Sequence, residues 1–249
     1  MFSFLNNIPQ VTRNILILNL LLYFLSQVLL SANVVDLFDI LSAHYINSPL
    51  FKPYQIVSHM FMHSPTQFTH IIFNMFILVT FGSHLEKIWG EKRFFIFYIL
   101  CGLGAFVLYN ALGFYELHKL KNYLIENNVG IDELNHSIIN NTVTNLDNYP
   151  VIQYYKQLSL NSMLGASGAL FGIMAGFAIL FPNTELMIMF LPVPIKAKFL
   201  IGGYFIYELY NSVVITRGDN VAHLAHVGGA IVGAIIILYW RKTDKKHFW

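Results

Sequence analysis

Hydrophobic residues along this 249-residue chain gather in long blocks separated by shorter polar segments. A helix needs about 20 mostly apolar residues to cross the hydrocarbon core of a bilayer. Six blocks are long enough, so we expect an all-α membrane protein with six transmembrane helices. The expected spans are residues 14–31, 68–85, 94–113, 163–181, 197–215 and 222–240.

The first block permits a second interpretation. Ser31 and Ala32 offer small residues at its end, so the block could be a cleaved signal peptide. Its apolar run is long for the core of a signal peptide, which favours a retained helix. Cleavage would leave the orientation expected for the other five spans unchanged.

The composition points to the same class of protein. Hydrophobic residues make up 56% of the chain and charged residues 11%, whereas a soluble domain carries about 25% charged residues. The formal charge of +2, without a basic cluster among aromatic residues, argues against a nucleic-acid partner. Cys101 is the only cysteine, which excludes an internal disulfide and a cysteine-based metal site.

Lysine and arginine are unevenly shared among the connections. With six spans, most of them lie on one side of the membrane, which marks that side as cytoplasmic and puts both termini there. We expect one domain over residues 1–241 and a basic cytoplasmic tail at 242–249. The basic residues of this side are Arg13, Lys87, Lys92, Arg93, Lys196, Lys198, Arg241, Lys242, Lys245 and Lys246.

Two connections on the outer side are longer than simple turns. Residues 32–67 are rich in aromatic residues and proline, and residues 114–162 are polar and rich in asparagine. The second connection is too long for a plain loop. Its first part, residues 114–128, has the pattern of a surface helix. A variable outer loop is an equally good interpretation of the whole insertion.

Polar side chains recur near the outer ends of spans two, four and six. His70 and Asn74 are four residues apart and so share one face of span two. Ser167 lies about one turn inside span four, and His223 and His226 open span six. Ionisable groups inside a membrane usually face the bundle interior or a water-filled cavity. We therefore expect these groups to face one cavity that is open to outer water.

Small residues at every fourth position predict which helices touch. Such stripes let two helix backbones approach closely in a membrane. If the stripes of spans four and six face each other, Ser167 and His226 come within hydrogen-bond reach. The stripes consist of Gly168, Gly172 and Gly176 in span four and of Ala225, Gly229 and Gly233 in span six.

A serine beside a histidine supplies the groups for nucleophilic catalysis. Neutral imidazole can remove the hydroxyl proton at pH 7, and N–H groups must face the oxyanion that forms. The backbone N–H of Ser167 near a helix start is one candidate donor, and His70 and Asn74 are others. Gly165 would let a substrate backbone come close. Neither histidine of span six has an Asp or Glu beside it in sequence, which favours a Ser–His dyad over a triad.

Three pieces of the sequence carry a family resemblance. They are "HIIFNMFILVTFGSHLEKIWGEKRF" in spans two and three, "GASGALFG" in span four and "AHVGGAIVG" in span six. In this order they resemble the rhomboid family of intramembrane serine proteases, over roughly residues 10–240. The resemblance implies a six-helix rhomboid bundle with Ser167 as nucleophile and His226 as general base. It also implies that His70 and Asn74 stabilise the oxyanion.

The resemblance assigns supporting roles as well. Phe171 takes the place of an aromatic residue that packs on the catalytic imidazole. Gly229 and Gly233 match glycines of the family that let span six approach span four. Glu86 and Arg93 match polar residues of the family that have structural roles.

For the activity, the family implies hydrolysis of peptide bonds in other transmembrane helices, near their outer ends and reached laterally past span five. The partners would be single-pass or multi-pass membrane proteins in the lipid bilayer, with no metal ion, cofactor or nucleic acid. We expect a multi-pass protein of the bacterial cytoplasmic membrane.

Two features depart from the family. Residues 53–55 read "PYQ" where many rhomboids carry Trp-Arg, and the insertion at 114–162 is longer than in compact bacterial members.

Several polar residues keep a second interpretation. His59 and His63 have helical i, i+4 spacing but no nearby carboxylate cluster, so a zinc site is disfavoured. His223 lies one turn before His226 and competes with it for the role of base, although the A-H-x-G-G pattern favours His226. Glu208 is an unusual acid in span five that could pair with a helix end or a tyrosine.

The rival function is that of a transporter or a catalytically inactive binder of membrane proteins, built around the same cavity. It predicts that Ser167→Ala leaves function intact, whereas a protease would lose its activity. An aspartyl protease is disfavoured because no paired intramembrane aspartates and no G-x-G-D motif occur.

Overall fold

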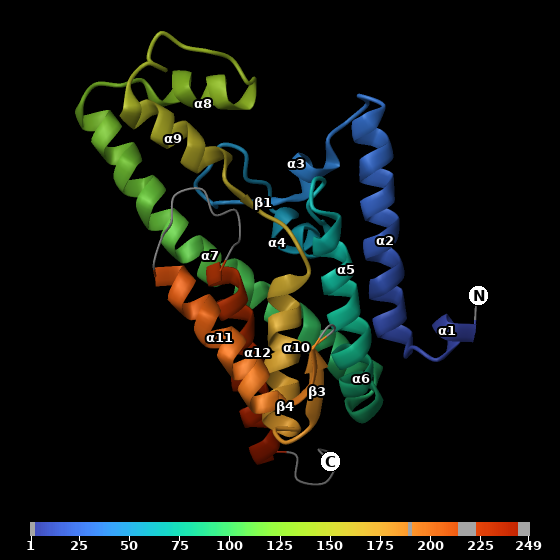
Figure 1. The fold of residues 1–249 in the computed structure, drawn as a ribbon. Coiled ribbons are helices and arrows are strands. Elements are labelled where there is room, and N and C mark those ends of the chain that lie inside the picture. Colours follow the sequence, from blue (N-terminus) through green and yellow to red (C-terminus); the bar gives the residue numbers. More distant parts are fainter. Residues whose placement is uncertain (1–2, 189–190, 214–222, 244–249) are drawn as a thin grey trace.

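The computed structural model describes residues 3–188, 191–213 and 223–243, and it is mostly helical (Figure 1). The last two residues of predicted span five, the first of span six and tail residues 244–249 lie outside the described residues. The helices are α1 (Ser3–Asn6), α2 (Gln10–Ser31), α3 (Leu37–Leu41), α4 (Gln55–Ser58), the 3-10 helix η1 (His59–Phe61), α5 (Phe68–Ile77), the π-helical turn η2 (Leu78–Gly82), α6 (Ser83–Trp89), α7 (Glu91–Glu126), α8 (Ile131–Ile139), α9 (Pro150–Leu160), α10 (Ser167–Leu180), α11 (Ala197–Val213) and α12 (His223–Thr243).

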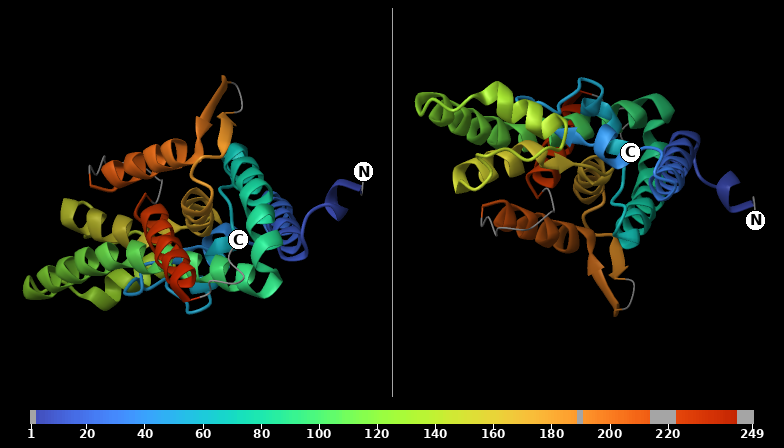
Figure 2. Two further views of the ribbon diagram at one scale, coloured as in Figure 1. Left: turned by 90° about the horizontal axis from the view of Figure 1, so that it is seen from below. Right: turned by 90° about the horizontal axis from the view of Figure 1, so that it is seen from above.

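Four short strands form two antiparallel pairs among these helices. β1 (Ala43–His44) pairs with β2 (Ser162–Met163), and β3 (Glu185–Ile188) pairs with β4 (Leu191–Lys196). Both views of Figure 2 show the β3–β4 hairpin projecting away from the helices. The β1–β2 pair joins the segment between α3 and α4 to the segment that precedes α10 (Figure 1).

Among the described residues, four helical segments are long and apolar enough to cross a membrane. They are α2, the continuous stretch Phe68–Trp89 formed by α5, η2 and α6, then α7, and α12. These segments confirm a membrane protein built of helices. Helices also form at predicted spans four and five, but α10 has only 14 residues and α11 has 17.

The helix of the third span continues beyond residue 113, since α7 runs without a break through 36 residues. The surface helix predicted at 114–128 is helical to Glu126, as the second part of α7. Gly113 does not end the helix; it makes room for the ring of Tyr45, which a Cβ at this position would meet at 1.9 Å. At 1.5 Å per residue α7 is about 54 Å long, so its second half extends beyond a hydrocarbon core of about 30 Å.

The projecting half of α7 carries the insertion as a folded unit with α8 and α9 (Figure 1). It has an apolar cluster of its own, so the interpretation as a plain variable loop is not needed. The buried residues of this cluster are Leu117, Leu124, Ile131, Leu134, Ile138, Ile152, Tyr155 and Leu158.

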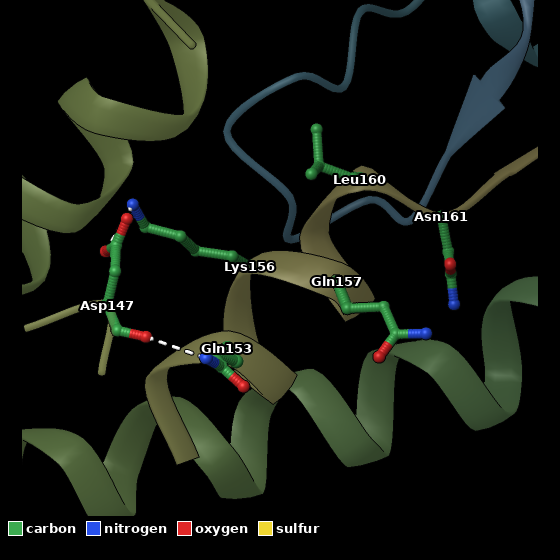
Figure 3. Close-up of a pocket in the computed structure, with 6 residues that line it drawn as sticks. All are labelled: Asp147, Gln153, Lys156, Gln157, Leu160 and Asn161. Carbon is green, nitrogen blue, oxygen red and sulfur yellow. Dashed lines mark hydrogen bonds and ion pairs between the residues drawn. The ribbon is translucent and has the colours of Figure 1, made fainter. Parts of the chain in front are cut away.

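The insertion also carries an open hollow of about 480 Å³, shown in Figure 3. Lys156 forms an ion pair of 2.7 Å with Asp147 at this hollow, and the ammonium group lowers the pKa of the Asp147 carboxyl. Gln153 donates a hydrogen bond to the backbone carbonyl of Asp147. None of the residues predicted for the catalytic site lines this hollow, whose lining consists of Asp147, Gln153, Lys156, Gln157, Leu160 and Asn161.

The two small-residue stripes of spans four and six face each other, as predicted. A Cβ on Gly229 would lie 1.8 Å from the carbonyl oxygen of Gly168, and one on Gly233 would lie 2.7 Å from the Cα of Gly172. The third partner, α7, is not evident from the stripes. A Cβ on Gly228 of α12 would lie 2.5 Å from the carbonyl oxygen of Gly104 on α7. Three backbones therefore meet at contact distance around α10.

Glu86 links α6 to the start of α2, and α6 lies at the end of the bundle away from the insertion (Figure 1). Its carboxylate is 2% exposed and accepts hydrogen bonds from the backbone N–H groups of Val11 and Thr12 and from the Thr12 hydroxyl, at 2.7 to 2.8 Å. A negative charge at the first turn of a helix stabilises its free N–H groups. The guanidinium of Arg93 lies 6.0 Å from the centre of the Trp240 ring. Both contacts agree with the structural roles that the resemblance implied.

Gly229→Ala tests the contact between α10 and α12. The added methyl group would meet backbone, which cannot give way as a flexible side chain can, so we expect a loss of at least about 1–3 kcal/mol in the free energy of unfolding. The matched control is Gly202→Ala on α11, where a Cβ meets nothing within 4 Å and helix propensity favours Ala. Unfolding in detergent, followed by circular dichroism, measures both. Equal stability of Gly229→Ala and wild type would contradict the packing described here.

Candidate active site

The first residue of α10 is Ser167, four residues later than the start that we predicted for this span. The preceding residues are held out of the helix, because Met163 pairs with Ala43 in the β1–β2 ladder. Gly165 follows with φ of +127°, a conformation that side chains rarely adopt, and its N–H donates to the carbonyl of His59 at 2.9 Å. The hydroxyl of Ser167 therefore sits at the N-terminus of α10.

The structure brings Ser167 and His226 together, since the Ser167 Oγ lies 2.8 Å from the Nε2 of His226. His226 is buried in the first turn of α12, on the helix that the glycine contacts bring against α10. The ring of Phe171 stacks on the imidazole, with ring centres 4.3 Å apart and planes 10° apart. Of the two histidines that competed for this position, His226 is the one that reaches the hydroxyl.

A carboxylate lies on the other side of His226, a contact that the pattern favouring a Ser–His dyad does not predict. Oε2 of Glu208 lies 2.9 Å from Nδ1 of His226 and 2.6 Å from Nδ1 of His223. The dyad was inferred from the absence of an acid beside the histidines in sequence. Glu208 comes instead from α11, 15 and 18 residues earlier in the chain. Besides these two imidazoles, Glu208 accepts a hydrogen bond from Tyr204, one turn earlier on α11, so the predicted pairing with a tyrosine is present.

On the other side of the hydroxyl, His70 and Gly165 bound a small space. A Cβ on Gly165 would lie 3.1 Å from Cε1 and Nε2 of His70 and 3.4 Å from Oγ of Ser167. The backbone N–H of Ser64 donates a long hydrogen bond of 3.4 Å to Nδ1 of His70. Because Nδ1 then acts as the acceptor, Nε2 carries the ring hydrogen and faces this space.

Asn74 follows His70 by one turn of α5 and has a buried side chain. Its side chain is 4% exposed, and its Nδ2 has no hydrogen-bond partner within the described parts of the chain. A buried amide without a partner is costly, typically by about 1–3 kcal/mol. Such a group needs an explanation, and a ligand oxygen at this site would provide one.

His59 and His63 lie beside the site and do not form an i, i+4 pair of zinc ligands on one helix. The 3-10 helix η1 ends at Phe61, so the two histidines do not share a helix face. Both are buried, and burial lowers the pKa of His59 to about 4 and that of His63 to about 3. Their rings are therefore neutral at pH 7. His59 stacks on Phe106, and His63 lies 5.2 Å from the His70 ring.

Among the described residues, a set of side chains other than His59 and His63 could hold a metal ion. The ligand atoms of Glu208, His223 and His226 all lie within 4.8 Å of one another. The Nδ1–Oε2 distances of 2.6 and 2.9 Å are those of hydrogen bonds, which require a hydrogen on each Nδ1. We therefore describe the three side chains as a hydrogen-bonded set. The signal for Glu208 in the sequence was an acid within an apolar span.

Comparison with known proteins identifies the family of the chain. The profile of the Rhomboid domain matches residues 51–243. The chain is similar to Rhomboid protein 1, mitochondrial, of Saccharomyces cerevisiae, with 24% identity over 213 residues. The matched region covers 84% of this chain and 46% of the yeast protein, so the chain spans about half the length of that relative. Because the domain profile matches most of the sequence, the chain belongs to the rhomboid family.

Proposed function

We propose that the protein is a serine endopeptidase that hydrolyses peptide bonds of transmembrane helices near the outer face of the membrane. The observation that carries this proposal is the 2.8 Å contact between Oγ of Ser167 and Nε2 of His226. A serine hydroxyl is a poor nucleophile until a positioned base takes its proton. Membership of the rhomboid family supports the same reaction.

In this reaction His226 acts first as base and then as acid. Oγ of Ser167 attacks the peptide carbonyl carbon while its proton passes to Nε2 of His226. The resulting imidazolium then gives that proton to the leaving amine as the C–N bond breaks, which leaves an acyl group on Ser167. A water molecule repeats the sequence, releases the carboxylic acid and restores the hydroxyl.

The oxyanion formed in each half of the reaction needs donors, and we assign them to the space beside Gly165. The backbone N–H of Ser167 has no acceptor within its own helix, because it belongs to the first turn. Nε2–H of His70 faces the same space, and Asn74 offers a buried Nδ2 without a partner. Donors fixed before the reaction stabilise developing charge without having to reorganise.

The depth of the site follows from the length of α10. At 1.5 Å per residue its 14 residues are about 21 Å long, which is shorter than the hydrocarbon core of about 30 Å. Its far end lies beside the β3–β4 hairpin and the end of α6, at the end of the bundle opposite the insertion (Figure 1). If that end reaches the membrane surface, Ser167 lies below the other surface, with the β1–β2 pair above it.

We assign the end of the bundle near α6 to the cytoplasm, which keeps both termini inside. Basic residues mark this side in membrane proteins, and Lys87, Lys92 and Lys198 belong to elements that begin or end there. On this assignment α10 and α11 cross the membrane with the four longer segments, which gives six spans. The bacterial cytoplasmic membrane stays a prediction, since the relative named above is mitochondrial.

For the substrate we propose single-pass or multi-pass membrane proteins whose helices reach Ser167 past α11. This helix buries only Ala197, Ile201 and Glu208, and large apolar side chains such as Phe199 and Tyr210 are more than 60% exposed. An apolar helix with so few buried residues is the one that a substrate helix could most easily pass. The proposed reaction uses no metal ion or cofactor.

Reaction with a fluorophosphonate separates this function from that of a transporter or inactive binder. We expect intact-protein mass to show one adduct on the wild type and none on Ser167→Ala or His226→Ala, because an unactivated hydroxyl does not react. Ser137→Ala, a buried serine of α8 remote from the site, should label as the wild type does. A folded wild type that gains no adduct and cleaves no transmembrane substrate would contradict the proposal.

Asn74→Ala tests the assigned oxyanion donor. The variant keeps Ser167 and His226, so it should still label, but cleavage of a fluorescent transmembrane peptide should slow by about 10²–10³-fold, as expected for one lost donor. The rate constant per folded molecule is the quantity to compare. Cleavage at the wild-type rate would remove Asn74 from the site.

Gly165→Ala tests whether the space beside His70 is needed. The methyl group would occupy that space, 3.1 Å from the imidazole and 3.4 Å from the nucleophile, so we expect the labelling and cleavage rates to fall at least tenfold. Gly90→Ala is the matched control, since Gly90 also has a positive φ, of 77°, but a Cβ there meets nothing within 4 Å. Comparable losses of activity in the two variants would point to backbone strain rather than to an occupied pocket.

A further inference from the structure

We propose that Glu208 is a positioning carboxylate for His226, so that the reaction uses a set of three side chains and not a dyad. This inference rests on the proposed function. Its basis is the 2.9 Å contact between Oε2 of Glu208 and Nδ1 of His226, on the side of the ring away from Ser167. The contact links α11 to the catalytic residues of α10 and α12.

The contact determines which nitrogen of His226 carries the hydrogen. An ionised carboxylate only accepts hydrogen bonds, so Nδ1 must be the donor. Nε2 of the neutral ring then has a free lone pair, directed at the hydroxyl of Ser167 at 2.8 Å. The other tautomer would place an N–H against the hydroxyl oxygen and a lone pair against the carboxylate. Glu208 therefore holds His226 in the tautomer that can act as a base.

The charge of Glu208 also favours the proton transfer itself. His226 becomes an imidazolium when it takes the Ser167 proton, at a site where protein and lipid exclude most water. An opposite charge 2.9 Å from Nδ1 stabilises that cation more strongly than it would in bulk water. The interaction is stronger after the proton transfer than before it, which is the condition for a contribution to rate.

His223 holds the carboxylate in place. Its Nδ1 donates to the same Oε2 at 2.6 Å, so one oxygen accepts two hydrogen bonds. The two imidazole rings stand nearly perpendicular, at 87°, and their centres are 6.4 Å apart. An ionised side chain inside a membrane is costly unless it is paired, and Glu208 is only 2% exposed. The second hydrogen bond offsets part of that cost and fixes the orientation of the carboxylate.

A purely structural role for Glu208, as a link between α11 and α12, must be distinguished from this one. The matched control is Glu86→Gln, because Glu86 is an equally buried carboxylate with three hydrogen bonds at the far end of the bundle. Both substitutions remove a buried charge of the same size. Only Glu208→Gln removes it from beside His226.

The experiment measures the reaction of a fluorophosphonate with the full-length protein in detergent and separates the inactivation rate constant from the inhibitor binding constant. We expect Glu208→Gln to lower the rate constant by about 10²–10⁴-fold with little change in binding; loss of the corresponding Asp in soluble serine proteases costs about 10⁴-fold. Glu208→Asp should recover part of the rate because it restores the charge. Glu86→Gln should react at the wild-type rate per folded molecule.

A second readout follows the tautomer directly. In ¹⁵N-histidine spectra of the wild type, we expect Nδ1 of His226 to be protonated and Nε2 to be unprotonated. Glu208→Met removes the acceptor and should give a mixture of tautomers. An unchanged tautomer in Glu208→Met would show that Glu208 does not set the tautomer of His226.

Three results would overturn the inference. If Glu208→Gln reacts as fast as the wild type while Ser167→Ala and His226→Ala are inert, Glu208 has no positioning role and the proposed function stands. If Glu208→Gln and Glu86→Gln lose reactivity equally, the role is structural. If the folded wild type neither reacts nor cleaves a transmembrane substrate, the proposed function fails and the inference fails with it.

Discussion

The site depends on the contact of two helix backbones, α10 and α12, at Gly168 and Gly229. A Cβ on Gly229 would lie 1.8 Å from the Gly168 carbonyl oxygen, so no residue with a side chain fits there without displacing one helix. Ser167 directly precedes Gly168, and His226 lies one turn before Gly229. The approach that two glycines permit is therefore what brings Oγ and Nε2 to 2.8 Å. Lipid offers no hydrophobic force between helices, so close packing of this kind has to supply the attraction.

The parts of this arrangement that could be predicted are those with a local signal. The recurrence of Gly168, Gly172 and Gly176 specifies a helix face without reference to any other segment, and the matching stripe on span six identifies its partner. The i, i+4 relation of His70 and Asn74 is equally local. These signals predict that Ser167 meets a histidine of span six if the two stripes face each other, and the A-H-x-G-G pattern favours His226 over His223. They do not give the start of α10, which depends on contacts with distant residues.

The features that escaped prediction all depend on such distant contacts. Ser167 begins its helix because Met163 pairs with Ala43, 120 residues earlier, and because Gly165 turns the chain. Glu208 is far from His226 in sequence and on another helix, so adjacency could not reveal the contact. An acid in an apolar span was the visible sign, but its partner depends on how α11 packs.

The polar groups of the site are arranged in two contrasting ways. Glu208, His223 and His226 satisfy one another through hydrogen bonds before any substrate binds. Asn74, by contrast, keeps a buried donor without a partner among the described residues, which weakens the folded state. The oxyanion proposed above would supply an acceptor for this donor during the reaction alone. On that proposal the interaction favours the transition state over the resting protein.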